Sequence, residues 1–289
     1  MLTGLMRLLA RLPLPWLHAT GSGLGWLVYL SSPKYAQRLR ENLMHSRVWA
    51  DEAQYQRLLH ATVSETGKAF AEMPAIWFRP QAEAAGWVRA AHGLDLVEAA
   101  REAGKGLILL TPHLGCFEIL AQYCALQSPL TILYRPPRMQ VLEPSMLHGR
   151  TRPNLTSASA DLKGVRLLLK ALRRGEAVGI LPDQVPAMGD GEWAGFFGRP
   201  AYTMTLASKL RESSGATMLM CFAKRLARGH GYEITFRSMA AASENEPPTR
   251  WLNRSLEEVI RLCPEQYLWS YNRYKQPRSK TKDRKERQG

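Results

Sequence analysis

Residues 104–118 read GKGLILLTPHLGCFE, and this stretch decides the fold. Its run Leu107-Ile108-Leu109-Leu110 is continuously apolar, which is typical of a strand that is buried on both faces of a sheet. Gly104 and Gly106 end a helical pattern before this run, and a second helical pattern begins near Phe117. A buried strand between two helices predicts an α/β domain with parallel strand pairs.

The same alternation of helix and strand signals extends along most of the chain. Helices are expected over residues 94–103, 117–126, 161–174, 203–213 and 255–262, and strands over 107–110, 130–134, 177–181, 217–223 and 232–236. Apolar residues also recur at helical spacing over 51–78, so a helical region precedes the sheet. The sequence therefore predicts a mixed, largely parallel sheet flanked by helices, with a helical N-terminal region.

The first 32 residues predict a membrane anchor. Residues 12–32 contain no Lys, Arg, Asp or Glu, and at ~1.5 Å per residue they could just cross ~30 Å of hydrocarbon. Pro13, Pro15 and several glycines interrupt this segment, so an amphipathic helix lying in the membrane interface is the alternative to a span. More cations follow the segment than precede it, which would keep the following domain of residues 33–275 on the cytoplasmic side if the segment spans the membrane. If the segment does not associate with a membrane, it would form an ordinary pair of buried N-terminal helices.

Composition bounds the class of protein and its partners. The chain has 289 residues, 45% of them hydrophobic and 22% charged, which argues against disorder and against a polytopic membrane protein. Its formal charge of +14 predicts an acidic partner or an anionic surface. Residues 276–289 form a basic tail, expected to be disordered, that serves either solubility or adhesion to anionic lipid. We find no pattern typical of nucleic-acid recognition, and the scattered cysteines and histidines predict neither a metal site nor a disulfide.

Polar clusters follow three of the predicted strands, where α/β sheets place their sites. The first contains His113 and Glu118, the second Arg135 and Arg138, and the third Asp183 and Gln184. If His113 lies in the turn before the helix, its ring can fold back toward Glu118, which would fix the tautomer of a general base. No GxSxG motif supplies a nucleophile, so the attacking hydroxyl would come from a substrate, in direct acyl transfer. A purely structural hydrogen bond between the two side chains is the alternative.

The chain resembles the lysophospholipid acyltransferase superfamily, and within it the late acyltransferases of lipid A biosynthesis. The resemblance rests on His113-x4-Glu118 in the block AHGLDLVEAAREAGKGLILLTPHLGCFE and on five further blocks in the same order. These blocks are RLRENL (38–43), LYRPPR (133–138), GEAVGILPDQ (175–184), FFGRP (196–200) and PEQYLWSYNRYK (264–275). The family commonly shows Asn-Trp between the glycine and the acid, where this chain has Cys116-Phe117.

The resemblance implies a glycerolipid-acyltransferase-like fold, no cofactor and an acyl-transfer reaction. The donor would be an acyl thioester on acyl carrier protein, and the acceptor a hydroxyl of a lipid A precursor. His113 would be the base and Glu118 its orienting group. Arg135 and Arg138 would hold a phosphate of the acceptor or stabilise charge on the thioester carbonyl. Asp183 and Gln184 would support that arginine or bind the sugar. Arg150 and Arg152 would be further phosphate contacts, with surface solvation as the alternative.

Two other functions stay open at this point. The same chemistry could serve another glycolipid or a lysophospholipid. A non-enzymatic, basic peripheral protein that binds anionic lipid is the third hypothesis. The sequence specifies neither the acyl-chain length nor the acceptor hydroxyl nor the oligomeric state.

Overall fold

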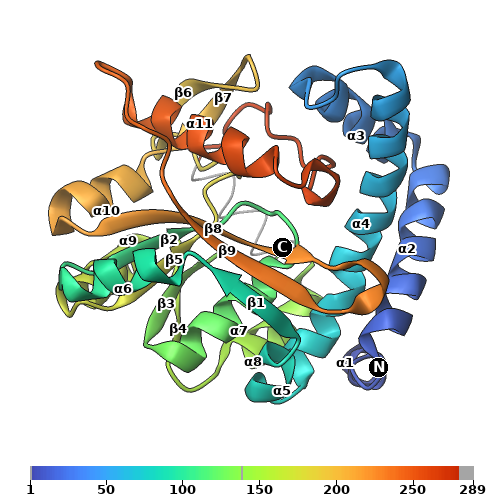
Figure 1. The fold of residues 1–289 in the computed structure, drawn as a ribbon, viewed down its shortest axis with the longest axis horizontal. Helices are drawn as coiled ribbons and strands as arrows, with labels where there is room; N and C mark the ends of the chain where they lie inside the picture. The colour runs from blue at the N-terminus through green and yellow to red at the C-terminus, as the bar shows by residue number, and fades with distance from the viewer. Residues whose placement is uncertain (1, 138, 280–289) are drawn as a thin grey trace.

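The computed structural model describes residues 2–137 and 139–279. Its centre is a seven-stranded sheet in the order β1-β9-β8-β2-β5-β3-β4, and every neighbouring pair is parallel except β8 and β9. Helices cover both faces of this sheet (Figure 1). The α/β class and the largely parallel, mixed sheet predicted from the sequence are thereby confirmed.

The elements have the following bounds. The strands are β1 (Val88–His92), β2 (Leu107–Leu110), β3 (Leu130–Tyr134), β4 (Leu155–Ser159), β5 (Ala177–Ile180), β6 (Gly191–Phe196), β7 (Arg199–Met204), β8 (Thr217–Arg225) and β9 (Tyr232–Ser238). The α-helices are α1 (Leu2–Leu9), α2 (Leu14–Ser31), α3 (Pro33–Ser46), α4 (Glu52–Phe78), α5 (Gln81–Ala85), α6 (Leu94–Glu102), α7 (Phe117–Gln127), α8 (Glu143–Arg150), α9 (Leu162–Arg173), α10 (Leu206–Ser214) and α11 (Pro248–Ile260).

The central strand β2 shows why a continuous apolar run is required. Leu107 and Leu109 belong to a buried cluster that includes residues of α6 and α7. Ile108 and Leu110 face the opposite way, into a cluster that includes residues of α9, α10 and α11. Because successive side chains of a strand point to opposite faces, both sets must be apolar when both faces are covered.

The N-terminal region is helical, as predicted, and α2 packs along α4 at one side of the molecule (Figure 1). Glycines make this contact so close that no side chain fits between the backbones. A Cβ on Gly25 would lie 2.3 Å from the Val63 carbonyl oxygen, and a Cβ on Gly67 would lie 2.0 Å from that of Gly21. Leu14 and Leu17 of α2 are buried in the core of the protein, so the predicted anchor shares that core.

Within residues 2–137 and 139–279, no helix is both long enough and apolar enough to cross a membrane. Membrane association of the N-terminal segment, and the division of the chain after residues 32 and 275, stay predictions. Of the predicted basic tail, residues 280–289 lie outside the described part of the chain.

Several boundaries differ from the predictions. The helix expected over residues 203–213 begins at Leu206, because Thr203 and Met204 end strand β7 of a hairpin with β6. Helix α11 begins at Pro248 rather than near Ser255, with Pro247 as its N-cap. Strands β1 and β4 were not predicted, since both lack an apolar run. No residue of β1 is fully buried, and β4 alternates between buried residues and more exposed ones.

Candidate active site

The candidate site lies at the carboxyl ends of β2 and β5, which are adjacent and parallel. The turn after β2 carries His113, and the turn after β5 carries Asp183 and Gln184. Gly115 adopts a φ of +59° in the first turn, and a Cβ there would lie 2.0 Å from the Ala223 carbonyl oxygen. The clusters that follow these two strands therefore lie together at the carboxyl edge of the sheet.

Backbone hydrogen bonds fix the turn that carries His113. The amide of Gly115 donates to the Gln266 carbonyl at 3.1 Å, and the amide of Cys116 donates to the Ala223 carbonyl at 2.8 Å. The carbonyl of His113 itself accepts from Leu268 at 3.0 Å. Strand β8 and residues 266–268 thus fix the position of His113 through backbone hydrogen bonds, one of them to the carbonyl of His113 itself.

Asp183 holds His113 through two hydrogen bonds. The backbone amide of His113 donates to Oδ2 at 2.9 Å, and the ring atom Nδ1 lies 2.8 Å from Oδ1. Asp183 is 3% exposed, and burial alone would raise the pKa of its carboxyl. The charge and hydrogen bonds of His113, together with the charge of Arg273, outweigh burial and lower that pKa. Asp183 is therefore a carboxylate that accepts a hydrogen bond from Nδ1–H of the ring and leaves Nε2 as the basic atom.

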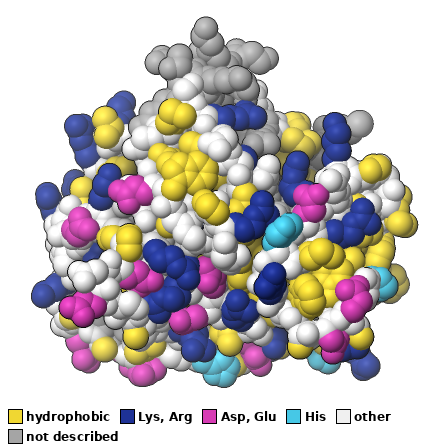
Figure 2. Space-filling model, turned by 90° about the horizontal axis from the view of Figure 1, so that it is seen from above, with side chains coloured by type: hydrophobic (Ala, Val, Ile, Leu, Met, Phe, Trp, Pro, Cys, Tyr) yellow, Lys and Arg dark blue, Asp and Glu magenta, His cyan; other side chains and the backbone are white. Residues whose placement is uncertain are grey.

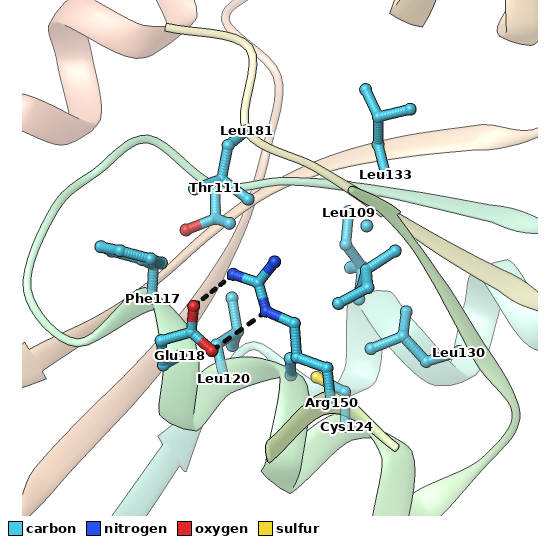
Figure 3. Close-up of a pocket in the computed structure, with 13 residues that line it drawn as sticks. Leu109, Thr111, Phe117, Glu118, Leu120, Cys124, Leu130, Leu133, Arg150 and Leu181 are labelled. Carbon is cyan, nitrogen blue, oxygen red and sulfur yellow. Dashed lines mark hydrogen bonds and ion pairs between the residues drawn. The ribbon is translucent and has the colours of Figure 1, made fainter. Parts of the chain in front are cut away.

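Glu118 does not hold the ring of His113 as the sequence predicted. Its carboxylate accepts from the Trp77 indole at 3.0 Å and pairs with the Arg150 guanidinium through Nε and Nη2 (Figure 3). Glu118 lies in the first turn of α7, and the partners of its carboxylate, Trp77 and Arg150, belong to α4 and α8. The direct partner of His113 comes instead from the neighbouring strand.

The described basic residues occupy different surroundings. Arg135 is exposed directly after β3, whereas Arg150 ends α8 and is mostly buried against Glu118. Arg152 donates to the carbonyls of Trp77 and Arg79, both at 2.8 Å, so its guanidinium ties the end of α4 to the chain after α8. Arg138 lies outside the described residues.

An apolar pocket lies between α7 and the sheet, beside the Glu118–Arg150 pair, and its empty volume of about 470 Å³ includes the open solvent at its mouth (Figure 3). Burial raises the pKa of the Cys124 thiol in its wall to about 12, so this sulfur is a neutral, apolar surface. The ring of Phe117 borders the pocket and contacts the ring of His113 at a centroid distance of 4.8 Å. The pocket is lined by Leu109, Thr111, Phe117, Glu118, Leu120, Ala121, Cys124, Leu130, Ile132, Leu133, Arg150, Gly179 and Leu181.

Sequence reasoning missed two residues that shape the site. Trp77 anchors Glu118 from α4, and nothing in its local sequence marks it. Arg273 is 2% exposed and donates to the Tyr202 carbonyl at 2.7 Å, close enough to Asp183 to lower its pKa. A cation within the aromatic block QYLWSYNRYK was the available signal for Arg273.

Cys116 lies between His113 and Glu118 in the sequence, so its thiol must be considered as a nucleophile. It is 1% exposed, and burial raises the pKa of its thiol well above the ordinary value. A buried, protonated thiol is a poor nucleophile, so Cys116 packs rather than reacts.

Comparison with known proteins places this arrangement in a family. The sequence profile of the bacterial lipid A biosynthesis acyltransferases matches residues 1–276. The chain belongs to this family. The family resemblance predicted from the sequence blocks is confirmed, and the protein is an acyltransferase of lipid A biosynthesis.

Individual members of the family align along nearly the whole chain. The lipid A biosynthesis lauroyltransferase of Escherichia coli K12 is 25% identical over 276 residues, which cover 94% of this chain and 89% of that protein. The palmitoleoyltransferase of the same organism is 27% identical over 275 residues, with the same two coverages. A lipid A biosynthesis acyltransferase of Haemophilus influenzae is 27% identical over 280 residues, covering 93% of this chain and 88% of that protein. The first two names specify different acyl chains.

Proposed function

We propose that this lipid A acyltransferase takes its acyl group from a thioester on acyl carrier protein and transfers it to a hydroxyl of a lipid A precursor, with His113 as general base. The observation that carries the proposal is His113, whose Nδ1 lies 2.8 Å from the buried carboxylate of Asp183 beside an apolar pocket. A base held in one tautomer next to a space for an aliphatic chain is what direct acyl transfer needs.

The reaction then proceeds without an acyl-enzyme. His113 Nε2 removes the proton of the acceptor hydroxyl while its oxygen attacks the thioester carbonyl carbon. The carbon–sulfur bond breaks as the tetrahedral intermediate collapses, and the imidazolium returns the proton to the departing thiolate. Asp183 stabilises the imidazolium throughout, which is the role first predicted for Glu118.

The apolar pocket would hold the acyl chain, and the charged pair at its edge would hold the carbonyl. Glu118 engages Nε and Nη2 of Arg150, and Nη1 takes no part in those two bonds. A guanidinium fixed in this way is a suitable donor to the oxyanion of the intermediate. Arg135, exposed at the same edge of the sheet, is suited to a phosphate of the acceptor.

The proposed location is the inner membrane, with the catalytic domain facing the cytoplasm. Helices α1 and α2 expose large apolar side chains, among them Leu8, Trp16, Leu27 and Leu30, at 62% to 74% of their surface. Such an uncovered apolar face supports insertion into the membrane interface rather than contact with water. Lys and Arg side chains are spread over the face seen in Figure 2, which suits both an anionic bilayer and an acidic carrier protein.

The test is a transfer assay with a labelled lipid A precursor and acyl carrier protein charged with chains of several lengths. We expect the His113→Ala variant to lose at least ~10²-fold in kcat/KM. The exposed His92, at the end of β1, provides the matched control, and His92→Ala should keep wild-type transfer. Transfer that survives in His113→Ala would refute the mechanism. Wild-type enzyme that transfers to a different glycolipid or to a lysophospholipid alone would refute the acceptor.

A further inference from the structure

The turn after β5 contacts both ring nitrogens of His113 with two consecutive residues. Asp183 takes Nδ1, and the side-chain Nε2 of Gln184 lies 3.0 Å from Nε2 of the ring. Because Nδ1 carries the ring proton and donates its hydrogen bond to Asp183, the ring Nε2 carries a lone pair and must accept the hydrogen bond from the Gln184 amide. The lone pair that the mechanism requires is therefore already occupied in this structure.

The imidazole is also closed in on its other sides. The His113 side chain is only 15% exposed, and Phe117 lies against the ring at a centroid distance of 4.8 Å. Rotation of the ring cannot free the base, because the same carboxylate binds Nδ1 and the backbone amide of His113. An acceptor hydroxyl can reach Nε2 only by replacing the amide of Gln184.

The movable part of this arrangement is the Gln184 side chain. On either side of it the chain is anchored, by the two bonds of Asp183 to His113 and by the Val185 amide, which donates to the Tyr271 hydroxyl at 3.0 Å. Gln184 itself is only partly buried. Its side chain can swing away from His113 while the backbone of the turn stays in place.

We infer that Gln184 caps the base until an acceptor hydroxyl displaces it, and that the cap suppresses hydrolysis of the bound acyl thioester. This inference rests on the proposed thioester donor and on His113 as base. In the suppressed reaction the oxygen of a water attacks the thioester carbonyl carbon and the carbon–sulfur bond breaks. The proton of that water passes through His113 Nε2 to the thiolate, giving a fatty acid and a thiol.

The cap discriminates because the two competitors reach the base in different ways. A glycolipid hydroxyl is delivered by all the other contacts of its headgroup, so the base meets it at a high effective concentration. A water brings only its own hydrogen bond, which must replace one from a tethered amide. Exclusion of water from reactive acyl groups is a general requirement of transfer enzymes.

The first experiment measures two products of the same thioester donor. Donor hydrolysis is followed without acceptor, and transfer is followed with the lipid A precursor. We expect Gln184→Ala to raise the ratio of hydrolysis to transfer by roughly 3- to 10-fold, the range that the loss of one hydrogen bond allows. Gln184→Asn, whose amide falls one methylene short, should act in the same direction. Gln127→Ala, at the exposed end of α7, is the control and should keep the wild-type ratio.

The outcomes separate this inference from the proposed function. Wild-type enzyme that transfers from no thioester would refute the proposed donor. Wild-type transfer with an unchanged ratio in Gln184→Ala would refute the cap alone. Equal losses of hydrolysis and transfer in that variant would also refute the cap, because Gln184 would then assist the reacting atoms. Hydrolysis that persists in His113→Ala/Gln184→Ala would show that the water is not activated by His113, which overturns the inference.

A second measurement needs no turnover. Gln184→Glu places a carboxylate beside Nε2, and an anion at that distance favours the imidazolium by roughly one to three pH units. The titration of His113, followed by NMR of histidine-labelled protein, should move to higher pH by that amount in Gln184→Glu. A titration that matches wild type would show that residue 184 does not contact the ring in solution.

Discussion

Two histidine–carboxylate pairs lie in the described part of the chain, and they differ in what surrounds them. His18 of α2 lies 3.0 Å from Glu72 of α4, and that carboxylate also accepts from Arg225 at 2.6 and 2.8 Å and from the Tyr232 hydroxyl at 2.8 Å. His18 is 4% exposed. The cluster joins α2 and α4 to strands β8 and β9.

The His113–Asp183 pair has the same chemistry in a different setting. The Asp183 carboxylate accepts from both the backbone amide and the ring of His113. The second ring nitrogen, Nε2, is bonded to the Gln184 side chain, which can move, and the pair lies beside an apolar pocket. Glu72, in contrast, is saturated by a cation and a hydroxyl. A histidine–carboxylate pair is therefore a candidate base only where its second nitrogen can be reached by substrate, and the surroundings decide this.

The largest expected effect falls on the His113 pair. Asp183→Asn replaces an acceptor with an amide whose NH₂ group faces Nδ1, so the ring adopts the tautomer with its proton on Nε2. Transfer should fall ~10²- to 10⁴-fold in kcat while the protein stays folded. The assay compares this variant with Asp95→Asn, an exposed change on α6 that should leave transfer intact. Wild-type transfer in Asp183→Asn would remove the distinction between the two pairs.

The corresponding change in the other pair should cost stability instead. Glu72→Gln leaves the buried Arg225 with Glu65 as its one remaining carboxylate partner among the described residues, and loss of one partner of a buried pair typically costs about 3–5 kcal/mol. Urea unfolding measures the difference. Glu176→Gln breaks the exposed pair with Arg174 and should cost less than about 1 kcal/mol. Equal stability of the two variants would show that the buried cluster does not hold the fold.

The stability that Glu72 contributes should also be visible in the wild-type protein, as a loss of stability at low pH. Burial would raise the pKa of Glu72, but Arg225 and His18 outweigh burial and lower it to about 2. A carboxyl whose folded pKa lies below its unfolded value of 4.5 contributes stability above pH 4.5, and this contribution is lost as pH falls toward 2. The loss amounts to about 3 kcal/mol, measured by denaturant unfolding over this range. Glu72→Gln should flatten this part of the profile, and an identical slope in both proteins would contradict the assignment.

The sequence revealed the members of the candidate site more reliably than their pairing. His113, Asp183 and Gln184 were all identified because each follows an apolar strand. Their contact depends on β5 lying next to β2, although β3 and β4 come between them in sequence. The fold therefore pairs His113 with Asp183, which is 70 residues away in the sequence. The short spacing from His113 to Glu118 led the sequence analysis to choose Glu118 as the partner instead. The His18–Glu72 pair, 54 residues apart, was missed for the same reason.

The fold shows the same limit. Continuous apolar runs marked β2, β3, β5 and β8, because both faces of these strands are buried. The edge strands β1 and β4 were missed, since each has one neighbouring strand and exposed side chains that interrupt any apolar run. The apolar pattern of a sequence indicates which side chains are buried, and side chains are buried least completely in the edge strands of a sheet.

The smallest expected effect concerns the close packing of α2 on α4, which places His18 beside Glu72. Gly67→Ala would place a methyl group 2.0 Å from the Gly21 carbonyl oxygen, so α2 must move away from α4. Overpacking of this kind costs about 1–3 kcal/mol, and urea unfolding should show it. Gly23→Ala is the matched control on α2, because a Cβ there meets nothing within 4 Å and the helix gains propensity. Because the strain lies at the structural pair, Gly67→Ala should leave kcat of the folded enzyme within about 3-fold of wild type. A larger loss of kcat in fully folded Gly67→Ala protein would mean that the position of α2 also controls the turn that carries His113. The two histidine–carboxylate pairs would then be structurally coupled.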